Sequence, residues 1–428
     1  MNEKTLSKAR GRESEQAASI QGESTALERV SPRTASHKSW QPHGLSKTHK
    51  RTERPAFDCI TLLLQGGGAL GAYQAGVYEA LAEADLHPDL VAGISIGAIN
   101  AAIIAGNPPK LRVDRLKEFW RGVTSPAVGL LRSMLGEGDA VRGFVNQMSA
   151  AAVLVSGVAG FFRLRIPSPW FCAPGAIEAT SYYDTMPLKA TLERLVDFDR
   201  VNADHSDLRL SLGAVNVRSG NMVYFDSPYQ IIASKHVMAS GALPPGFPPI
   251  EIEGEYYWDG GLVSNTPLQW IAMTQRPPDS LFFQVDLWSA SGELPRSILE
   301  VATRQKEIQY SSRTRAFTDY VKERHRLDNT ILALLEELPE EMKQSEHAQY
   351  LRSAAERRFY NLVHLIYRPK GYEGDSKDYE FSRGSMEDHW RAGYYDAVHA
   401  LRHPEIFERA SGPLETLATF DFGRDHGD

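Results

Sequence analysis

A serine flanked by glycines is the first residue in this sequence whose type and context indicate chemistry. The pentad from Gly93 to Gly97 reads Gly-Ile-Ser-Ile-Gly, and it lies between the apolar run Leu90 to Ile94 and a small apolar stretch that favours a helix. In a strand-turn-helix context, a sharp turn would push the hydroxyl of Ser95 toward a substrate, and the glycines would let neighbouring backbone pass without a Cβ clash. Ser95 is therefore a candidate nucleophile for acyl transfer.

A glycine-rich loop lies upstream of this serine. Residues 66 to 71 read Gly-Gly-Gly-Ala-Leu-Gly, directly after the apolar run Ile60 to Leu64, and a helical pattern follows to about Ala84. Backbone N–H groups of Gly67 and Gly68 at the start of that helix could stabilise an oxyanion, and one such donor typically contributes about 3 kcal/mol to transition-state stabilisation.

The same loop also matches a dinucleotide-binding pattern. Gly66, Gly68 and Gly71 have the spacing G-x-G-x-x-G after a strand. That fold expects an acidic residue at the end of the next strand, where this chain continues into the turn of Ser95. The dinucleotide interpretation is therefore the less favoured one.

An aspartate later in the chain is the candidate base. Asp259 ends the short strand pattern Glu255 to Trp258 and is followed by Gly260 and Gly261. A serine nucleophile needs a group that accepts its proton, and a carboxylate in a dry site can do this. Asp-Gly turns are also common structural elements, so the assignment depends on the presence of the other two motifs.

Together, the three motifs resemble the patatin-like phospholipase family, whose members use a Ser-Asp dyad in place of a Ser-His-Asp triad. Two further segments agree with the resemblance, Ala239 to Pro249 before the aspartate and Asn265 to Pro267 after it. The resemblance covers about residues 58 to 290, and the blocks follow one another in the family's order.

The resemblance implies an α/β fold in which helices sandwich a central sheet, and a two-step acyl transfer that needs no cofactor and no metal. Asp259 would accept the proton of Ser95, whose oxygen would attack the ester carbonyl and form an acyl-enzyme. The substrate would be a lipid or another acyl ester, as for a phospholipase or esterase. The glycines implied are Gly66, Gly67, Gly68 and Gly71 in the oxyanion loop, and Gly93, Gly97, Gly260 and Gly261 in the two turns.

One departure from the family leaves an alternative open. Many members carry Lys or Arg inside the glycine loop, where this chain has Leu70. A protein of this fold that binds lipid or a partner without turnover therefore stays an alternative. A Ser-His-Asp triad is a further one, because histidines follow Asp259 in the required order. They are His325, His347, His364 and His389.

The composition excludes several classes of protein. The chain has 428 residues, of which 42% are hydrophobic and 24% charged, and it has two cysteines, Cys59 and Cys172. Two cysteines exclude a disulfide framework and a multi-cysteine zinc module. The formal charge of -7 argues against nucleic acid as a partner.

The sequence divides into three parts. Residues 1 to 56 carry eleven Lys/Arg against six Asp/Glu, have few aliphatic residues and lack a signal-peptide pattern, so we expect a disordered basic tail. Residues 57 to 290 form the expected catalytic domain. Residues 291 to 428 form a mainly helical extension, with a strand pattern near 359 to 367 and an amphipathic helix near 386 to 401.

An apolar insertion lies between the serine and the aspartate. Residues 143 to 162 carry no charge and are followed by Pro167, Pro169 and Trp170. Its polar residues and glycines make it a poor membrane span, so we expect an apolar cap over the acyl cleft at about 143 to 170. An ordinary buried helix and an interfacial membrane contact are the alternatives.

These features predict a cytoplasmic acyl hydrolase, and they leave a transient peripheral contact with a membrane surface open. The oligomeric state, the headgroup and the acyl chain length cannot be inferred from the sequence.

Overall fold

The computed structural model describes residues 45–125, 138–271, 278–312, 314–355, 358–409 and 417–422. These residues belong to one compact unit, Leu45–Asp428. The expected tail lies outside the described residues up to position 44, and so does the segment 126–137 that precedes the apolar insertion.

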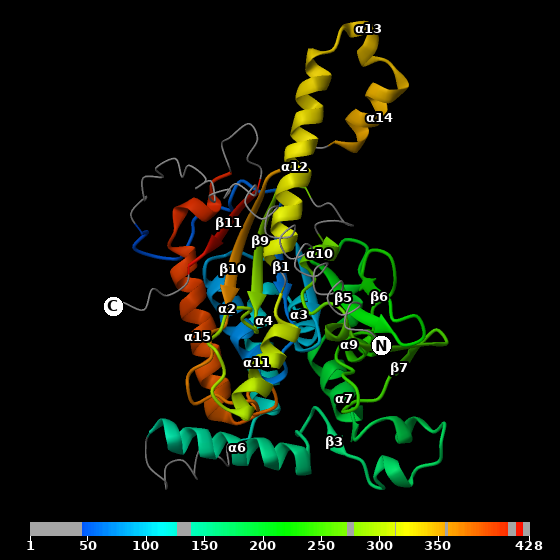
Figure 1. The fold of residues 1–428 in the computed structure, drawn as a ribbon, viewed down its shortest axis with the longest axis vertical. Helices are drawn as coiled ribbons and strands as arrows, with labels where there is room; N and C mark the ends of the chain where they lie inside the picture. The colour runs from blue at the N-terminus through cyan, green and yellow to red at the C-terminus, as the bar shows by residue number, and fades with distance from the viewer. Residues whose placement is uncertain are drawn as a thin grey trace, which may run out of the picture. The chain divides into compact units, whose positions relative to one another are not determined.

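A mostly parallel sheet forms the centre of this unit (Figure 1). Within the described residues it has nine strands in the order β11-β10-β9-β1-β2-β5-β8-β7, with β6 paired to β5. The pairs from β11 to β5 are parallel, and β6, β7 and β8 add antiparallel pairs at one side. The strands are β1 (Cys59–Leu64), β2 (Leu90–Ile94), β5 (Arg209–Asn216), β6 (Met222–Asp226), β7 (Ile250–Ile252), β8 (Glu255–Asp259), β9 (Ser280–Asp286), β10 (Tyr360–Ile366) and β11 (Leu417–Asp421).

Helices and short turns surround this sheet. The longer helices are α2 (Ala72–Glu83), α3 (Ile96–Ala105), α4 (Pro109–Gly122), α6 (Asp139–Ser156), α7 (Met186–Leu195), α11 (Ile298–Tyr310), α12 (Thr314–Glu337), α14 (Glu346–Ala354) and α15 (Arg383–Leu401). The shorter elements are η1 (Gly68–Gly71), η2 (Pro169–Phe171), η3 (Ile177–Thr180), α8 (Phe198–Val201), α9 (Ser234–Ser240), η4 (Gly260–Leu262), α10 (Leu268–Trp270), α13 (Glu340–Lys343), η6 (Pro404–Phe407) and the paired strands β3 (Arg163–Leu164) and β4 (Tyr183–Asp184).

Both faces of the sheet are buried, which explains why every residue of β1 is buried and all but Thr61 are apolar. Alternate β1 residues, such as Leu62, join one core cluster with α2, α3 and α15. Leu63 points to the other face, where it clusters with Leu268 of α10 and Val321 of α12. The predicted α/β fold with helices on both sides of a central sheet is therefore confirmed.

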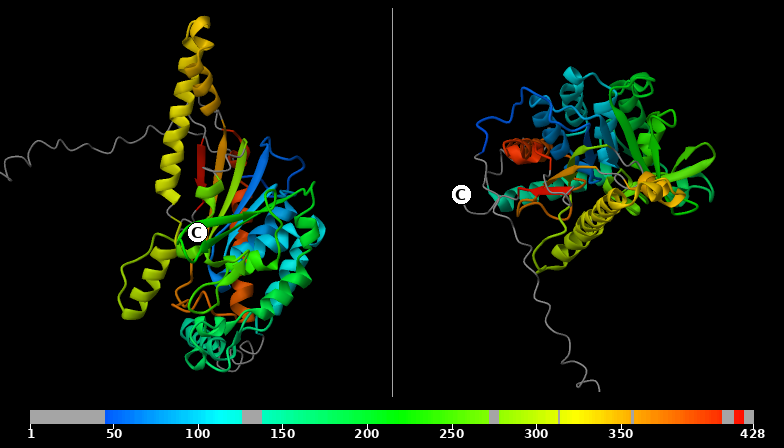
Figure 2. Two further views of the ribbon diagram at one scale, coloured as in Figure 1. Left: turned by 90° about the vertical axis from the view of Figure 1, so that its right-hand side faces the viewer. Right: turned by 90° about the horizontal axis from the view of Figure 1, so that it is seen from above.

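The C-terminal extension shares this sheet. Its expected strand near 359 to 367 is β10, which pairs in parallel with β9 over Tyr360–Ile366. Its expected amphipathic helix is α15, which packs against α2. In contrast, α12 leads α13 and α14 away from the sheet, at the end opposite α6 (Figures 1 and 2).

The last residues of the expected tail contact the folded body. Ser46 N–H donates to the carbonyl of Arg402 at 2.8 Å, and the guanidinium of Arg51 lies 3.7 Å from the ring centroid of Phe407. Arg54 pairs with Asp89. Residues 45 to 56 therefore pack on the body through their basic side chains, which a prediction based on low hydrophobicity could not detect.

Candidate active site

Ser95 lies in a strained turn between β2 and α3. Its φ of 57° and ψ of −122° place a residue with a side chain in a region that glycine normally occupies. The flanking glycines permit this turn, because an added Cβ at Gly93 would meet the carbonyl of Gly97, and one at Gly97 would meet the carbonyl of Leu64. The N–H of Ser95 donates to the carbonyl and the hydroxyl of Ser240, at 3.2 and 3.1 Å.

Asp259 ends β8 and is almost fully buried, with 2% of its surface exposed. Its backbone N–H donates to the carbonyl of Ala242 at 3.0 Å. Its carboxylate accepts a hydrogen bond from Gly261 N–H at 2.7 Å, and the side chain of Ser95 lies close enough to act on its pKa. Burial raises the pKa of Asp259 to about 6, although Ser95 and the N–H of Gly261 act in the opposite direction.

The glycine loop runs directly beside Ser95. An added Cβ at Gly66 would lie 3.0 Å from the Cβ of Ser95, so the absence of a side chain lets the loop approach the serine. Within the described part of the chain, the N–H groups of Gly67 and Gly68 have no protein acceptor. These are the two donors that the sequence indicated for an oxyanion.

The neighbouring carbonyl groups fix the direction of these two N–H groups. The carbonyl of Gly66 accepts from Trp288 Nε1 at 2.9 Å and from Asn265 Nδ2 at 3.0 Å, and the carbonyl of Gly67 accepts from Leu70 N–H at 3.2 Å. In a planar trans peptide, the carbonyl and the following N–H point in opposite directions. The N–H groups of Gly67 and Gly68 therefore point away from these partners.

Of the remaining predicted glycines, two pack against neighbouring residues outside the cavity and one lines the cavity. Gly71 does not line the cavity: an added Cβ there would lie 2.5 Å from Ile96, and its carbonyl accepts from Asn100 at 2.9 Å. Gly260 packs against the backbone of Gly213, whereas Gly261 lines the cavity beside Asp259.

A cavity of about 350 Å³ contains the serine, the aspartate and the glycine loop. Its walls are mainly apolar and aromatic, and they include Ile99, Val153, Phe161, Phe162, Phe247 and Phe381. A groove of similar size, about 370 Å³, lies between α2, α4 and α15, and it contains neither the serine nor the glycine loop. An apolar cavity with a few convergent polar groups suits an acyl chain with a reacting ester at one end.

The apolar insertion borders this cavity, as expected for a cap. Val153 and Leu154 of α6 and the following Phe161 and Phe162 line it. The ring of Phe162 lies 4.9 Å from that of Tyr183 and 5.1 Å from that of Phe247. That the insertion closes over an acyl chain stays a prediction.

Sequence reasoning missed the residues that the C-terminal extension contributes to the cavity. Tyr310, at the end of α11, and the loop residues Asp378, Tyr379 and Phe381 line it together with Ser95. The carbonyl of Tyr310 accepts from Gln65 Nε2 at 3.0 Å and from Asn265 Nδ2 at 2.8 Å. No motif marked these positions.

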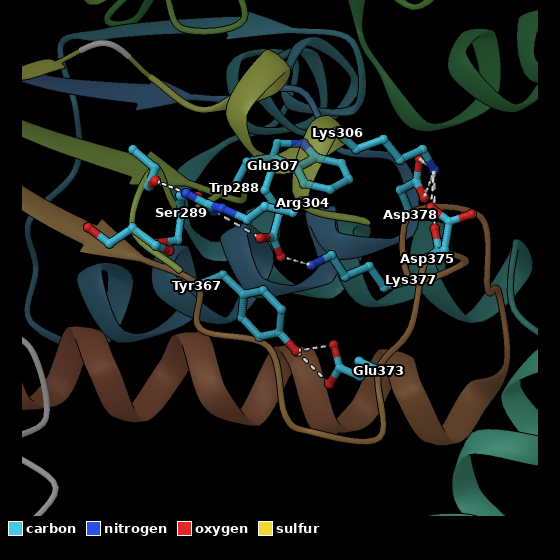
Figure 3. Close-up of polar contacts among 12 residues, drawn as sticks. Trp288, Ser289, Arg304, Lys306, Glu307, Tyr367, Glu373, Asp375, Lys377 and Asp378 are labelled. Atoms are coloured by element: carbon cyan, nitrogen blue, oxygen red, sulfur yellow. Dashed lines mark hydrogen bonds and ion pairs between the residues drawn. The ribbon is translucent and has the colours of Figure 1, made fainter. Parts of the chain in front are cut away.

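A polar network connects α11 with the loop that carries Asp378 (Figure 3). Arg304 donates to Glu307 at 3.0 Å, and Glu307 also accepts from Lys377 at 2.6 Å. The start of the loop is held by Tyr367, whose hydroxyl donates to the carboxylate of Glu373.

Three histidines of the alternative triad, His347, His364 and His389, lie elsewhere. No histidine of the described residues lines the cavity that contains Ser95. His389 is buried in α15 and lies 3.4 Å from Glu373, and His364 lies in β10, where burial lowers its pKa to about 4. His347 is exposed in α14.

Searches for a metal site and for a membrane span were negative over the described residues. No group of three or more His, Cys, Asp or Glu is arranged to hold a metal ion there. No helix among those residues is sufficiently long and apolar to cross a membrane.

Family models match two parts of the chain. A model described as patatin-like phospholipase matches residues 62–270, and one described as patatin phospholipase matches residues 308–412. These matches together cover most of the chain. The chain belongs to the patatin-like phospholipase family.

Individual relatives are similar over short stretches. Lysophospholipase nte1 of Aspergillus terreus is 44% identical over 81 residues, which cover 17% of this chain and 5% of the relative. Patatin-like phospholipase domain-containing protein 7 of Mus musculus is 40% identical over 69 residues, which cover 16% of this chain and 5% of the relative. The chain thus spans about a twentieth of the length of these curated relatives.

Two bacterial proteins of known structure are also similar. VipD from Legionella pneumophila has a TM-score of 0.33 at 14% identity, with 86% of this chain and 72% of that chain covered. The type III effector ExoU has a TM-score of 0.33 at 12% identity, with 83% of this chain and 55% of that chain covered.

Proposed function

We propose that this protein is a serine hydrolase that cleaves acyl esters of lipids or related compounds through a Ser-Asp dyad. The observation that carries the proposal is one arrangement in the cavity. The side chain of Ser95 lies close enough to the buried carboxylate of Asp259 to lower its pKa, and the free N–H groups of Gly67 and Gly68 belong to the loop that borders the same cavity. An apolar cavity encloses all of these groups.

The reaction begins when the Ser95 oxygen attacks the ester carbonyl while its proton passes to Asp259. Negative charge then develops on the former carbonyl oxygen, which the N–H groups of Gly67 and Gly68 stabilise. Asp259 returns the proton to the leaving alcohol, and the acyl group stays on Ser95. In the second step water attacks the acyl carbonyl and passes a proton to Asp259. The bond between the acyl group and the Ser95 oxygen then breaks, the acid leaves, and Asp259 returns the proton to Ser95.

The environment of Asp259 makes it a better base than an exposed aspartate. Its pKa of about 6 leaves it ionised at neutral pH and closer to the working pH than an ordinary aspartate. It is 2% exposed, so little water competes for its oxygens. Since no histidine lines the cavity within the described residues, direct transfer from Ser95 to Asp259 is favoured over a triad.

Turnover of p-nitrophenyl esters of several chain lengths tests this proposal. We expect the wild type to hydrolyse them, and we expect Ser95→Ala and Asp259→Asn each to lose at least about 10³-fold in kcat/KM while keeping the fold, because each removes one member of a cooperative pair. Full activity in either variant would contradict the dyad. A folded wild type without turnover and without fluorophosphonate labelling would support the lipid-binding alternative.

The outer surface of the cap supports transient contact with a lipid surface. Phe144, Met148 and Val155 recur along one face of α6 and are 55%, 51% and 73% exposed. Trp170 and Phe171 of η2 are more than 80% exposed, and η2 lies at the same end of the unit as α6 (Figure 1). Large exposed apolar side chains at one end of a protein suit insertion into a lipid interface.

The exposed arginine near α6 and the position of the cavity favour the same orientation of the protein on a lipid surface. Leu154 of α6 lines the cavity, so the exposed face of this helix is continuous with the wall of the cleft. Arg163, which follows α6, pairs with Asp184 at 2.8 Å but is 69% exposed at its side chain, so its remaining donors could contact acidic headgroups. A lipid held at this surface would need to move only a short way to enter the cavity.

Co-sedimentation with vesicles tests the lipid contact without catalysis. In a Ser95→Ala background, Trp170→Ser combined with Phe171→Ser should weaken binding to anionic vesicles by at least about tenfold, because each buried aromatic contributes more than about 1 kcal/mol. Tyr350→Ser is a matched control, since this exposed residue lies on α14 at the other end of the unit. Equal sedimentation of all variants with the vesicles would refute the lipid contact. It would also be refuted if the exposed aromatic residues bound only a second copy of the chain and the protein did not sediment with vesicles.

A further inference from the structure

The backbone of Asp378 touches the oxyanion loop from the C-terminal part of the chain. Its carbonyl accepts a hydrogen bond from Ala69 N–H at 2.7 Å, and an added Cβ at Gly68 would clash with the same carbonyl oxygen. Ala69 N–H is the next donor of the loop after those of Gly67 and Gly68. Its bond to Asp378 fixes the peptide that follows the second oxyanion donor.

The side chain of Asp378 is held by Lys306 of α11 (Figure 3). Lys306 Nζ lies 2.9 and 3.1 Å from the two carboxylate oxygens and also donates to the carbonyl of Asp375 at 3.1 Å. Burial raises the pKa of Asp378 in spite of the nearby ammonium. Burial also lowers the pKa of Lys306, but the carboxylates outweigh it and the pKa is raised.

The next residue on each segment forms a second ion pair. Glu307 follows Lys306 on α11, and Lys377 precedes Asp378 in the loop. Lys377 Nζ lies 2.6 Å from the Glu307 carboxylate, and these side chains are only 3% and 13% exposed. In the first pair α11 carries the positive charge, and in the second pair the loop carries it. The charges therefore favour one alignment of the loop on α11, because a shift by one residue would bring like charges together.

The second pair also reaches the other end of the glycine loop. Lys377 Nζ lies 5.4 Å from the ring centroid of Trp288, and Trp288 Nε1 donates to the carbonyl of Gly66 at 2.9 Å. The glycine loop is therefore held at Gly66 through Trp288 and at Ala69 through Asp378. Gly67 and Gly68, whose N–H groups face the proposed oxyanion, lie between these two points.

We propose that the ion pairs Lys306–Asp378 and Glu307–Lys377 form a clamp by which the C-terminal extension positions the oxyanion loop for catalysis. This inference rests on the proposed acyl-hydrolase function. Lys306 and Asp378 are positioning residues, because they act through the Asp378 carbonyl and not on the substrate. Residues 66 to 71 contain no ionisable side chain, so the loop carries no charge of its own, and its charged support comes from the C-terminal extension.

Kinetics with p-nitrophenyl butyrate and inhibition by an alkylboronic acid test the clamp. The boronate forms a tetrahedral adduct with a nucleophilic serine and so reports on the oxyanion hole. Lys306→Met and Asp378→Asn should each lower kcat about tenfold and raise the boronate inhibition constant by about the same factor, with KM within about twofold. The double variant should be no worse than either single one, because both remove the same pair.

Two further variants separate positioning from general stability. Lys306→Arg keeps the charge and should restore most of kcat. Lys343→Met removes a lysine that pairs with Glu340 at 2.7 Å in α13, away from the cavity, and should leave kcat unchanged. Thermal melting monitors folding. Amide exchange of peptides that cover residues 66–71 should be faster in Lys306→Met and Asp378→Asn than in the wild type, and this measurement requires no turnover.

The clamp is refuted if Lys306→Met and Asp378→Asn fold and keep kcat, boronate inhibition and amide exchange within about twofold of the wild type. It is also refuted if the loss lies in KM alone. If Lys306→Met does not fold, the results for Asp378→Asn and Lys306→Arg decide. An inactive wild type would instead contradict the proposed function, and the amide-exchange result would still decide the clamp.

Discussion

Two parts of the chain border one cavity, and they hold their residues there by different means. Ser95 and Asp259 stand at the ends of strands β2 and β8 in the central sheet, where backbone hydrogen bonds and close glycine contacts fix them. Asp378 and Phe381 reach the cavity from a loop between β10 and α15 that ion pairs hold in place. The proposed reacting groups thus depend on the backbone for their position, whereas the C-terminal support depends on side-chain charges.

We therefore expect mutations in the two parts to change activity by different amounts. Changes in the strand-end residues should abolish activity, because chemistry and backbone geometry are lost together. Changes in the C-terminal residues should alter rate or chain-length preference by smaller factors, because the reacting groups stay in place.

The largest effect is expected at Asp259, and it has opposite signs for activity and stability. Activity requires the ionised carboxylate, so kcat/KM of the wild type should rise with pH, be half-maximal near the pKa of about 6, and level off above it. The raised pKa also means that ionised Asp259 destabilises the fold. Its displacement from an ordinary value near 4 corresponds to about 3 kcal/mol.

Denaturant unfolding of Asp259→Asn checks the stability part. Above the folded pKa of about 6 the carboxylate is ionised in both states and the fold bears the cost of burial, so the variant should be more stable than the wild type at pH 8. Below about pH 4 both states are protonated, and the difference should vanish. If the variant is less stable than the wild type at pH 8, the buried Asp259 carboxylate does not destabilise the fold, which would contradict this expectation.

A smaller but still large effect is expected at Gly68. Its φ of +55° disfavours a side chain, and an added Cβ would clash with the backbone carbonyl of Asp378. Gly68→Ala should lower kcat/KM about 10²-fold by shifting an oxyanion donor. Gly371→Ala is the matched control, since nothing lies within 4 Å of its added Cβ. Unchanged kinetics of Gly68→Ala would exclude this loop as the oxyanion site.

The smallest effect is expected at Phe381, in the C-terminal loop. Its ring lies 5.9 Å from that of Phe161 and 6.5 Å from that of Phe162 in the wall of the cavity. Phe381→Ala should enlarge the acyl cleft and shift the preferred ester to longer chains, with changes in kcat/KM within about tenfold.

A second buried phenylalanine provides the control for this change. Phe407 lies in η6, outside the cavity, so Phe407→Ala should cost a similar free energy of unfolding, about 3 kcal/mol, without a change in chain preference. An identical chain-length profile for both variants would show that Phe381 does not contact the acyl chain.

The sequence predicted the strand-end part of the site and not the C-terminal part, for a physical reason. A tight turn at Ser95 and a close approach at Gly66 both require glycine at fixed spacing, so local sequence records them. The contact of Lys306 with Asp378 joins residues far apart in the chain, and charged residues on a helix are usually solvated. The strand pattern near 359 to 367 was likewise readable from the sequence, but not the pairing of this strand, β10, with β9.

The apolar insertion at about 143 to 170 shows an intermediate case. Its apolar composition predicted contact with the cleft, which Val153 and Phe161 make. The same composition could not indicate that Trp170 and Phe171 remain exposed, because exposure depends on how the segment folds over the body.

The most direct test of the account is to trap and locate the covalent intermediate. The wild type would be mixed with a slowly deacylating p-nitrophenyl ester at a pH above 6, quenched in acid, digested and analysed by mass spectrometry. The account predicts that the acyl group is found on Ser95, and that Ser95→Ala shows no acylation. An acyl group on another residue, or turnover by the wild type with Ser95 unmodified and dispensable, would contradict it.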